Sequence, residues 1–433
     1  MTLRTARWLL TAALCLLLPA VALGQELLVA PGNGRGIYQP GETIRWNVEA
    51  KGGKVAEAAF VLKKGGLTEL SKGRLPLAEG RETKIEAKLD EPGWLLLEVS
   101  VKLAQGKKLT ALGGALVSPE KIRPAVPRPA DFDAFWADKL AELAAVPMNV
   151  KLDPLDNAKA NVDYCKITMD NIRGSHIRGQ LARPKQGGKF PAMFIVQWAG
   201  VYPLDKGWVA GRAAEGWLAL NINAHDLPID EPPQFYKDQA AGALKDYTAI
   251  GNDDRETSYF LRMYLSCYRA AQYLTERPDW DGRTLVVAGG SQGGLQSLVA
   301  AGLCPKITAA LAEVPAGCDL SGPVAGRLPG WPMWYWKTQG KDEAKVRRAA
   351  GYYDVLNFAA RVKCPVLVGA GLIDTTCPPP GVFAAYNQLQ GPKEIVVLPL
   401  AEHGDKQGSH RPYYARLSAW SQALLKGQPA PVK

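Results

Sequence analysis

Ser291 is the side chain of this sequence best suited to covalent chemistry, because it lies in a glycine-rich turn. The run GGSQGG (289–294) separates the apolar stretch TLVVA from the helix-like stretch LQSLVAAGL. Turns of this kind either bind a phosphate through backbone N–H groups or present a nucleophilic serine. The run matches G-x-S-x-G, and it matches neither G-x-G-x-x-G nor a phosphate loop with its lysine. The pattern predicts a nucleophile elbow between a strand and a helix, the alternative being a turn of structural role alone.

A serine hydroxyl becomes an effective nucleophile only beside a base, which is most often histidine. Of the four histidines in the chain, His403 and His410 follow Ser291. In α/β-hydrolases the chain order is serine, acid, histidine, so the base is expected to be one of these two. His403 comes just after the apolar stretch EIVVLPL and is the favoured base. His410 is then expected to be an exposed surface residue.

Asp374 is the favoured acid of such a triad. It ends the apolar stretch PVLVGAGLI, a position from which it could orient the imidazole and stabilise the imidazolium. Asp319 and Asp354 are weaker candidates, because no comparable strand precedes them. Alternatively, Asp374 could cap a helix predicted to begin near Pro380.

Two backbone N–H groups are expected to bind the oxyanion that forms during acyl transfer. One belongs to Gln292, directly after the serine, and the other to Gly200, Val201 or Tyr202 in FIVQWAGVYP. This serine chemistry implies no metal ion and no organic cofactor.

Three tryptophans, Trp331, Trp334 and Trp336, lie close together in the stretch GRLPGWPMWYWKTQG. Their flat faces could stack on sugar rings and so bind substrate. Packing of the same rings inside the domain is an equally good interpretation for any one of them.

Positioning these residues requires a parallel β-sheet. Six apolar stretches follow helix-like segments, which indicates parallel strands covered by helices on both faces. The stretches are AMFIVQWAG, WLALNINA, TLVVAGG, AALAEVP, CPVLVGAGL and EIVVLPL. The fold class is therefore α/β, of the α/β-hydrolase type.

The chain is predicted to have four parts. Residues 1–24 read as a signal peptide, with Arg4 and Arg7 before an apolar run and a small-residue cleavage site near Gly24-Gln25, so export to the periplasm or the medium is expected. Alternating apolar residues and frequent turns predict a small immunoglobulin-like β-sandwich over residues 25–118. A proline-rich linker (119–130) then leads to the catalytic domain (131–433).

Composition excludes several classes of protein. The formal net charge is +10, but no block of like charges marks a nucleic-acid-binding arm. After the leader, no apolar run is long enough to span a membrane. The six cysteines of the mature chain are far apart, so a zinc site is not expected, and they could be paired or remain buried free thiols.

Residues 119–426 resemble the carbohydrate esterase family of acetyl xylan esterases and cephalosporin-C deacetylases. The similar stretches are RPADFDAFW, GNDDRETSYFLRMYLSCYRA, VVAGGSQGG and YYDVLNFAARVKCPVLVGAGLIDTTCPPPGVFAAYNQLQGPKEI, followed by EHG. The resemblance implies a triad of Ser291, Asp374 and His403, with the N–H groups of Gln292 and Val201 as oxyanion donors. It also implies a homo-oligomer, a hexamer being common in the family.

Two segments depart from the pattern of that family. Gly200-Val201 stands where the family usually has Gly-Tyr, and INAHDLP replaces an Asp-x-Arg-Gly segment after the next strand. The predicted function is removal of acetyl groups from acetylated sugars or related small esters. The alternatives are a broad carboxylesterase, a prolyl-oligopeptidase-like peptidase, and a non-catalytic carbohydrate-binding protein.

Overall fold

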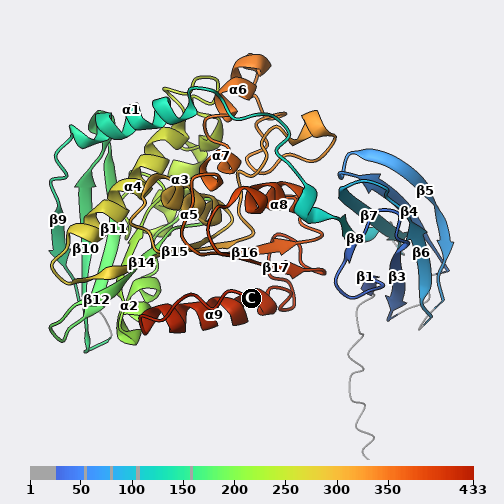
Figure 1. The fold of residues 1–433 in the computed structure, drawn as a ribbon, viewed down its shortest axis with the longest axis horizontal. Coiled ribbons are helices and arrows are strands. Elements are labelled where there is room, and N and C mark those ends of the chain that lie inside the picture. Colours follow the sequence, from blue (N-terminus) through green and yellow to red (C-terminus); the bar gives the residue numbers. More distant parts are fainter. Residues whose placement is uncertain (1–25, 53–55, 79–80, 104–107, 157–158) are drawn as a thin grey trace, which may run out of the picture.

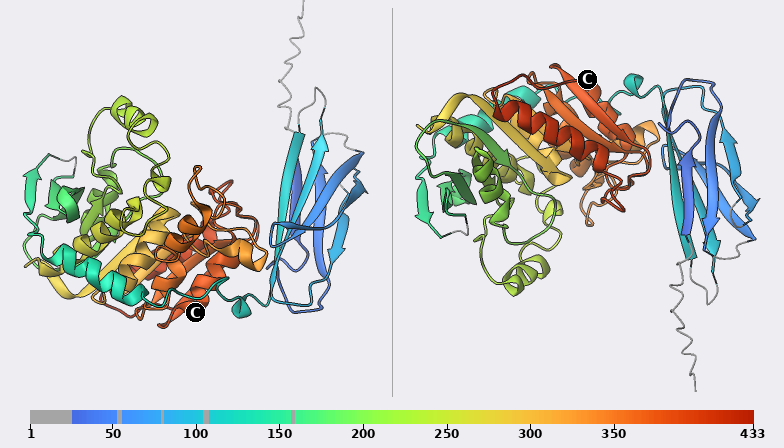
Figure 2. Two further views of the ribbon diagram at one scale, coloured as in Figure 1. Left: turned by 90° about the horizontal axis from the view of Figure 1, so that it is seen from above. Right: turned by 90° about the horizontal axis from the view of Figure 1, so that it is seen from below.

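The computed structural model describes residues 26–52, 56–78, 81–103, 108–156 and 159–433, which form a β-sandwich and an α/β domain (Figure 1). The predicted signal peptide lies outside the described residues. The β-sandwich stands at one end of the molecule, next to the edge of the α/β domain that contains β16 and β17, as the views in Figure 2 agree.

A nine-stranded sheet in the order β17-β16-β15-β14-β12-β13-β11-β10-β9 forms the centre of the α/β domain. The six strands β12 to β17 pair in parallel, and β11, β10 and β9 extend the sheet beyond β13 as an antiparallel edge. The strands are β9 (Lys151–Pro154), β10 (Val162–Asp170), β11 (His176–Pro184), β12 (Phe190–Ile195), β13 (Leu218–Ile222), β14 (Trp280–Gly290), β15 (Ala309–Glu313), β16 (Val366–Gly371) and β17 (Lys393–Leu398). All six predicted strands are present, so the predicted mostly parallel α/β fold is confirmed.

Helices cover both faces of this sheet. One face carries α1 (Phe132–Ala144), α4 (Tyr259–Glu276), α5 (Gln292–Leu303), α7 (Val355–Ala359) and α8 (Pro379–Gln388), and the other carries α2 (Gly207–Glu215) and α9 (Arg411–Leu425) (Figure 1). Two further helices, α3 (Pro233–Ala241) and α6 (Glu343–Ala350), lie in the connections. Neighbouring residues of β14 point into the cores on opposite faces of the sheet. Val287 packs with α4 and α5, and Val286 packs with α2 and α9. This burial on both faces explains the continuous apolar runs in the sequence.

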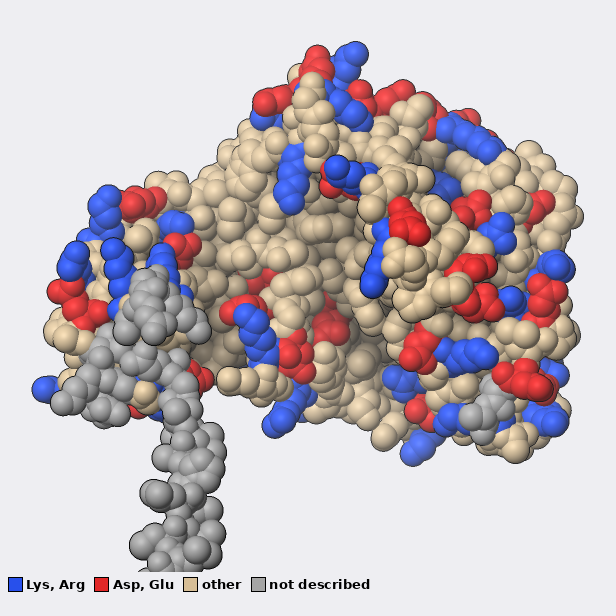
Figure 3. All heavy atoms as spheres, turned by 180° about the vertical axis from the view of Figure 1, so that it is seen from behind, with Lys and Arg blue, Asp and Glu red and all other residues tan. Residues whose placement is uncertain are grey.

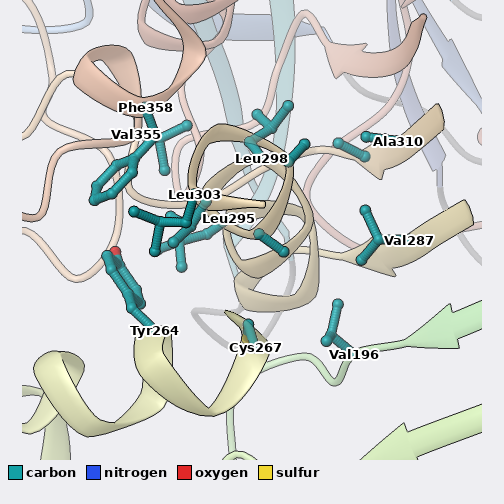
Figure 4. Packing of buried hydrophobic residues seen from close by; sticks show 14 of the residues in the cluster. Val196, Tyr264, Cys267, Val287, Leu295, Leu298, Leu303, Ala310, Val355 and Phe358 are labelled. Carbon is teal, nitrogen blue, oxygen red and sulfur yellow. The ribbon is translucent and has the colours of Figure 1, made fainter. Parts of the chain in front are cut away.

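Helix α5 is the most deeply buried helix next to the sheet. All of its residues from Gln292 to Leu303 are buried, with Tyr264 and Cys267 of α4 on one side and Val355 and Phe358 of α7 on the other (Figure 4). A helix enclosed in this way is held rigidly by packing. The residue at its N-terminus is therefore held in a fixed place.

The N-terminal part is a two-sheet β-sandwich. One sheet has the order β1-β3-β6 and the other β2-β8-β7-β4-β5. The strands are β1 (Glu26–Pro31), β2 (Ile37–Tyr38), β3 (Ile44–Lys51), β4 (Glu57–Lys64), β5 (Thr68–Pro76), β6 (Thr83–Ala87), β7 (Gly93–Lys102) and β8 (Lys108–Val117). Ile44, Trp46 and Val48, which alternate along the sequence, are all fully buried between the sheets. The predicted alternation and sandwich are confirmed.

The β-sandwich packs against the α/β domain rather than hanging from a free linker. Trp94 of β7 is buried in the core of the α/β domain, and its indole N–H donates to the carbonyl oxygen of Leu372 at 3.0 Å. The backbone N–H of Leu328 donates to the carbonyl oxygen of Gly65 at 2.8 Å. Within the predicted linker, Ile122 is also buried in that core. The N-terminal domain therefore contacts Leu372, two residues before Asp374.

We expect Gly114→Val to destabilise the protein at this interface. A Cβ at Gly114 would lie 2.0 Å from the carbonyl oxygen of Leu372, so one backbone would have to move. Overpacking of this kind costs about 1–3 kcal/mol of the free energy of unfolding. Denaturant unfolding measures the loss. Gly187→Val is the matched control, since nothing lies within 4 Å of its added Cβ; equal losses in both variants would contradict the tight contact.

The surface carries charges of both signs. Lysine and arginine side chains are interspersed with aspartate and glutamate over the face in Figure 3. Elsewhere in the described chain, charged side chains are also paired, as Arg45 is with Glu86 and Lys63 with Glu98. Among the helices of the described residues, none is long and apolar enough to cross a membrane.

Candidate active site

Ser291 occupies a strained turn between β14 and α5. Its backbone φ is 56° and its ψ is −119°, a conformation that residues with a Cβ rarely adopt. A Cβ at Gly289 would lie 2.7 Å from the backbone of Gly293, and a Cβ at Gly293 would lie 2.7 Å from the carbonyl oxygen of Val196. Only glycine fits at these two positions, which accounts for the glycines around the serine. The geometry is that of the predicted elbow.

The predicted serine, base and acid lie in hydrogen-bonding contact. His403 Nε2 is 2.9 Å from Ser291 Oγ, and His403 Nδ1 is 2.8 Å from Asp374 Oδ2. The side chain of His403 is 29% exposed, whereas that of Asp374 is fully buried. If His403 carries its proton on Nδ1, which the carboxylate favours, Nε2 is free to accept the serine proton. Three side chains separated by up to 112 residues are thus arranged for general-base activation of a hydroxyl.

Asp374 is fixed by the loop after β16. Its Oδ1 accepts hydrogen bonds from the backbone N–H groups of Thr376 and Cys377, both at 2.8 Å. Helix α8 begins only at Pro379, and Asp374 does not cap it, so the alternative interpretation of Asp374 as a helix cap is wrong. Oδ1 of Asp374 therefore fixes the loop after β16, and Oδ2 faces the imidazole of His403.

Asp354 and Asp319, the weaker candidates for the acid of the triad, have other hydrogen-bond partners. Asp354 caps α7 through the N–H of Leu356 and also accepts from the N–H groups of Asp319 and Leu320. Burial, together with the charge of Asp319, raises the pKa of the Asp354 carboxyl to about 7. Asp319 itself pairs with Arg327 at 2.6 Å. Neither carboxylate contacts His403.

His410 is buried, so the prediction that it is an exposed surface histidine is wrong. Its Nδ1 lies 2.7 Å from Glu313 Oε1, and its Nε2 lies 3.1 Å from the carbonyl oxygen of Glu402. Burial alone would lower the pKa of His410, but the hydrogen bond and charge of Glu313 outweigh burial and raise it. Because both of its partners are acceptors, a protonated His410 holds the backbone next to His403.

The backbone N–H groups of the two predicted oxyanion donors have no protein acceptor among the described residues. Gln292 is the first residue of α5, where backbone N–H groups have no acceptor within the helix. Within the described chain, the N–H of Val201 donates to no protein acceptor. Gly200 before it has a φ of 128°, a value that favours glycine. Both predicted donors therefore lie at turns that leave their N–H groups unpaired.

The three predicted substrate-contacting tryptophans have different environments. Trp334 is fully buried, and its indole N–H donates to the carbonyl oxygen of Thr248, so its face is closed to a sugar. Trp331 stacks on Phe260 with ring centroids 6.1 Å apart. Trp336 is 47% exposed. Trp198, which was not singled out from the sequence, is 51% exposed and stacks on Tyr202.

One group of possible metal ligands overlaps the site. In the described part of the chain, ligand atoms of Asp374, Cys377 and His403 lie within 4.8 Å of one another. Burial holds the pKa of the Cys377 thiol well above its usual range, so the thiol stays protonated. His403 and Asp374 are already bonded to each other. The arrangement suits proton transfer better than metal binding. The six described cysteines are all free thiols.

His225 and Tyr247 contact the two predicted donor segments, and Tyr259 contacts His225; sequence reasoning missed all three residues. His225 precedes Ser291 in the chain, so the serine–acid–histidine order excluded it as the base. The sequence contains no periodicity or motif that links its ring to the Gly200 loop 25 residues earlier.

Comparisons with known proteins identify the family of the chain. Residues 115–421 match the family model of acetyl xylan esterases (AXE1). An acetyl esterase, Axe7A, from Xylanibacter ruminicola is 33% identical over 385 residues, which cover 87% of this chain and 86% of the relative. Residues 119–433 make up less than three quarters of the chain, so this alignment extends into the β-sandwich.

Two solved structures are similar to the α/β domain. The acetyl xylan esterase from Paenibacillus sp. R4 superposes with a TM-score of 0.60 and 27% identity, covering 70% of this chain and 98% of that one. The acetyl xylan esterase 1 from Thermoanaerobacterium sp. JW/SL YS485 gives a TM-score of 0.61 and 25% identity, covering 71% of this chain and 97% of that one. Each of these two structures therefore aligns over nearly its whole length with a part of this chain that is about as long as the α/β domain.

Proposed function

The chain belongs to the acetyl xylan esterase family and is a carboxylic ester hydrolase, and we propose that it releases acetate from acetylated xylan fragments through a covalent acetyl-Ser291 intermediate. The contact series from Ser291 through His403 to Asp374 is the single observation on which this mechanism rests. The named activities of the relatives support the choice of the acetyl group and of a xylan-type substrate.

In the first half of the proposed reaction, Ser291 Oγ attacks the acetyl carbonyl carbon. His403 Nε2 takes the hydroxyl proton as the Oγ–C bond forms, and Asp374 stabilises the resulting imidazolium. The N–H groups of Gln292 and Val201 bind the oxyanion of the tetrahedral intermediate. His403 then returns the proton to the sugar oxygen as its bond to carbon breaks, which leaves acetyl-Ser291.

In the second half, water repeats the attack. His403 takes a proton from the water molecule, the hydroxide adds to the acetyl carbon, and the same N–H groups bind the second oxyanion. Collapse of this intermediate breaks the bond to Ser291 Oγ, which recovers its proton from His403. Acetic acid is released and ionises to acetate in water, and the enzyme returns to its starting protonation state.

The alternatives have weaker support. A prolyl-oligopeptidase-like enzyme would need a multi-bladed propeller, whereas the described N-terminal strands form two packed sheets. A non-catalytic carbohydrate-binding protein would have no need for a serine in a strained elbow with its base at 2.9 Å. A broad carboxylesterase would have the same triad and differs only in the acyl groups that it accepts.

We expect a strong preference for acetyl esters over longer acyl esters. Rates for p-nitrophenyl acetate, butyrate and octanoate, together with acetate release from acetylated xylo-oligosaccharides, measure it. We expect kcat/KM to fall at least about tenfold from acetate to butyrate, since an acyl pocket sized for acetate would reject added methylene groups by steric overlap. Equal rates on butyrate and acetate, with no acetate released from the oligosaccharides, would favour the broad carboxylesterase.

Export and oligomerisation are also proposed. Cleavage near Gly24-Gln25 would release the mature enzyme to the periplasm or the medium, and the support for this is the composition of residues 1–24. A homo-oligomer is proposed from the resemblance to the hexameric members of the family.

A further inference from the structure

The two segments that depart from the family pattern contact each other through a hydrogen bond. His225, in the segment INAHDLP, places its Nε2 3.0 Å from the carbonyl oxygen of Gly200. Gly200 and Val201 form the segment that lacks the usual tyrosine. His225 is 1% exposed, so it is interior to the protein and out of reach of a bulky substrate.

A series of hydrogen bonds determines which ring nitrogen of His225 is the donor. Arg262 Nη2 donates to the Tyr259 hydroxyl oxygen at 3.0 Å, so the hydroxyl hydrogen is free to point to His225 Nδ1, 2.6 Å away. Nδ1 is then the acceptor, and Nε2 carries the hydrogen that is donated to Gly200. Burial lowers the pKa of His225 to about 4, so the ring stays neutral and keeps this tautomer near neutral pH.

The hydrogen bond to Gly200 also orients the N–H of Val201. The carbonyl of Gly200 and the N–H of Val201 belong to one planar trans peptide, in which they point in opposite directions. A carbonyl held toward the buried imidazole therefore turns the N–H away from it. Because Gly200 has a φ of 128°, without a Cβ to restrict it, this peptide could otherwise rotate readily.

A second tyrosine connects the same ring to the other predicted donor segment. The Tyr247 ring packs edge-to-face against His225 with centroids 4.8 Å apart. Its hydroxyl donates to Gln292 Oε1 at 2.5 Å. His225 and its two tyrosines thus touch both segments whose N–H groups are proposed to bind the oxyanion.

We propose that His225 is a positioning residue, which holds the Gly200–Val201 peptide so that its N–H is aimed at the oxyanion of acyl transfer. This inference rests on the proposed function. It also explains why the two departures from the family pattern occur together. The loop at Gly200 and Val201 lacks the usual tyrosine, and the imidazole of His225 holds this loop through the Gly200 carbonyl. His225 itself touches neither the substrate nor the reacting atoms.

The test compares His225→Leu, His225→Gln and Tyr259→Phe with the full-length enzyme on p-nitrophenyl acetate. Loss of one oxyanion donor costs about 10²–10³ in kcat, and a donor that is present but misdirected should cost less. We expect kcat to fall about 30- to 100-fold in His225→Leu, with KM changed by less than about threefold. His225→Gln, which can place an amide donor near Nε2, should retain kcat within about tenfold. Tyr259→Phe, which frees Nδ1, should lose about three- to tenfold.

Tyr236→Phe is the matched control. Tyr236 is also 1% exposed, and its hydroxyl donates to the Pro228 carbonyl, but it does not contact His225 or the Gly200 loop. Active sites are counted with an organophosphonate that labels Ser291, and kcat is expressed per labelled site. The pH at which kcat/KM is half-maximal should not move in the His225 variants, because the triad is intact and only oxyanion binding is weakened.

The outcomes separate this inference from the proposed function. If the wild type is inert, or Ser291→Ala is as active as the wild type, the proposed function fails. If the wild type is active and Ser291→Ala inactive, a His225→Leu enzyme with normal kcat overturns the positioning role. A raised KM at normal kcat, or an equal loss in Tyr236→Phe, also overturns it. Should His225→Leu not fold, an unchanged kcat in Tyr259→Phe overturns the positioning role in its place.

Discussion

Ser291→Ala is expected to lower kcat for p-nitrophenyl acetate by about 10⁴–10⁶, which leaves only the rate that oxyanion binding and substrate orientation provide without a nucleophile. His403 at 2.9 Å would then have no hydroxyl to deprotonate. Alanine has the same backbone strain as serine at a φ of 56°, so the fold should be unaffected. Nitrophenol release and thermal unfolding, measured on the same preparation, check both statements.

Ser297→Ala provides the matched control within the same helix. Ser297 is fully buried, and its hydroxyl donates to the carbonyl oxygen of Gly293 at 2.8 Å, so its loss costs a comparable hydrogen bond near the elbow. We expect kcat to stay within about threefold, because no reacting group is removed. A Ser291→Ala enzyme that keeps more than a small fraction of the wild-type rate would mean that another residue is the nucleophile.

The parallel part of the sheet could be predicted because its strands are buried on both faces. Such strands are continuous apolar runs, and β14 and β16 stand out in the sequence for that reason. The antiparallel edge formed by β9, β10 and β11 did not stand out. β10 alternates between buried and partly exposed residues, a weaker signal that is easily taken for a loop. How the sandwich packs on Leu372 depends on the fit of Gly114 and Trp94, which no local pattern encodes.

The site could be predicted where a residue type and its position after a strand were both informative. Ser291, Asp374 and His403 each follow an apolar strand, and the parallel sheet brings its carboxyl ends to one edge. The environment of His410 could not be predicted, because its partner, the partly buried Glu313 at the end of β15, comes from 97 residues earlier in the chain. The same limit applies to His225, whose partners are a carbonyl and a tyrosine distant in sequence.

Asp374→Asn is the second large effect, and the hydrogen bonds of this site predict its mechanism. The N–H groups of Thr376 and Cys377 both donate to Oδ1 at 2.8 Å, so an asparagine there would turn its carbonyl oxygen to them. The amide nitrogen would then face His403 Nδ1 and donate to it. A histidine that accepts at Nδ1 carries its hydrogen on Nε2, the atom that faces Ser291, and cannot take the serine proton.

We therefore expect Asp374→Asn to lower kcat by about 10⁴, close to 5 kcal/mol of transition-state stabilisation, with a smaller change in KM. Steady-state hydrolysis of p-nitrophenyl acetate measures both constants. Asp319→Asn is the matched control: Asp319 is also buried and pairs with Arg327, so its replacement should lower stability while kcat stays within a few-fold. A loss of only about tenfold in Asp374→Asn would mean that the imidazole keeps its working tautomer without the carboxylate. The carboxylate would then contribute charge alone, and the two amide contacts to Oδ1 would serve only to fold the loop.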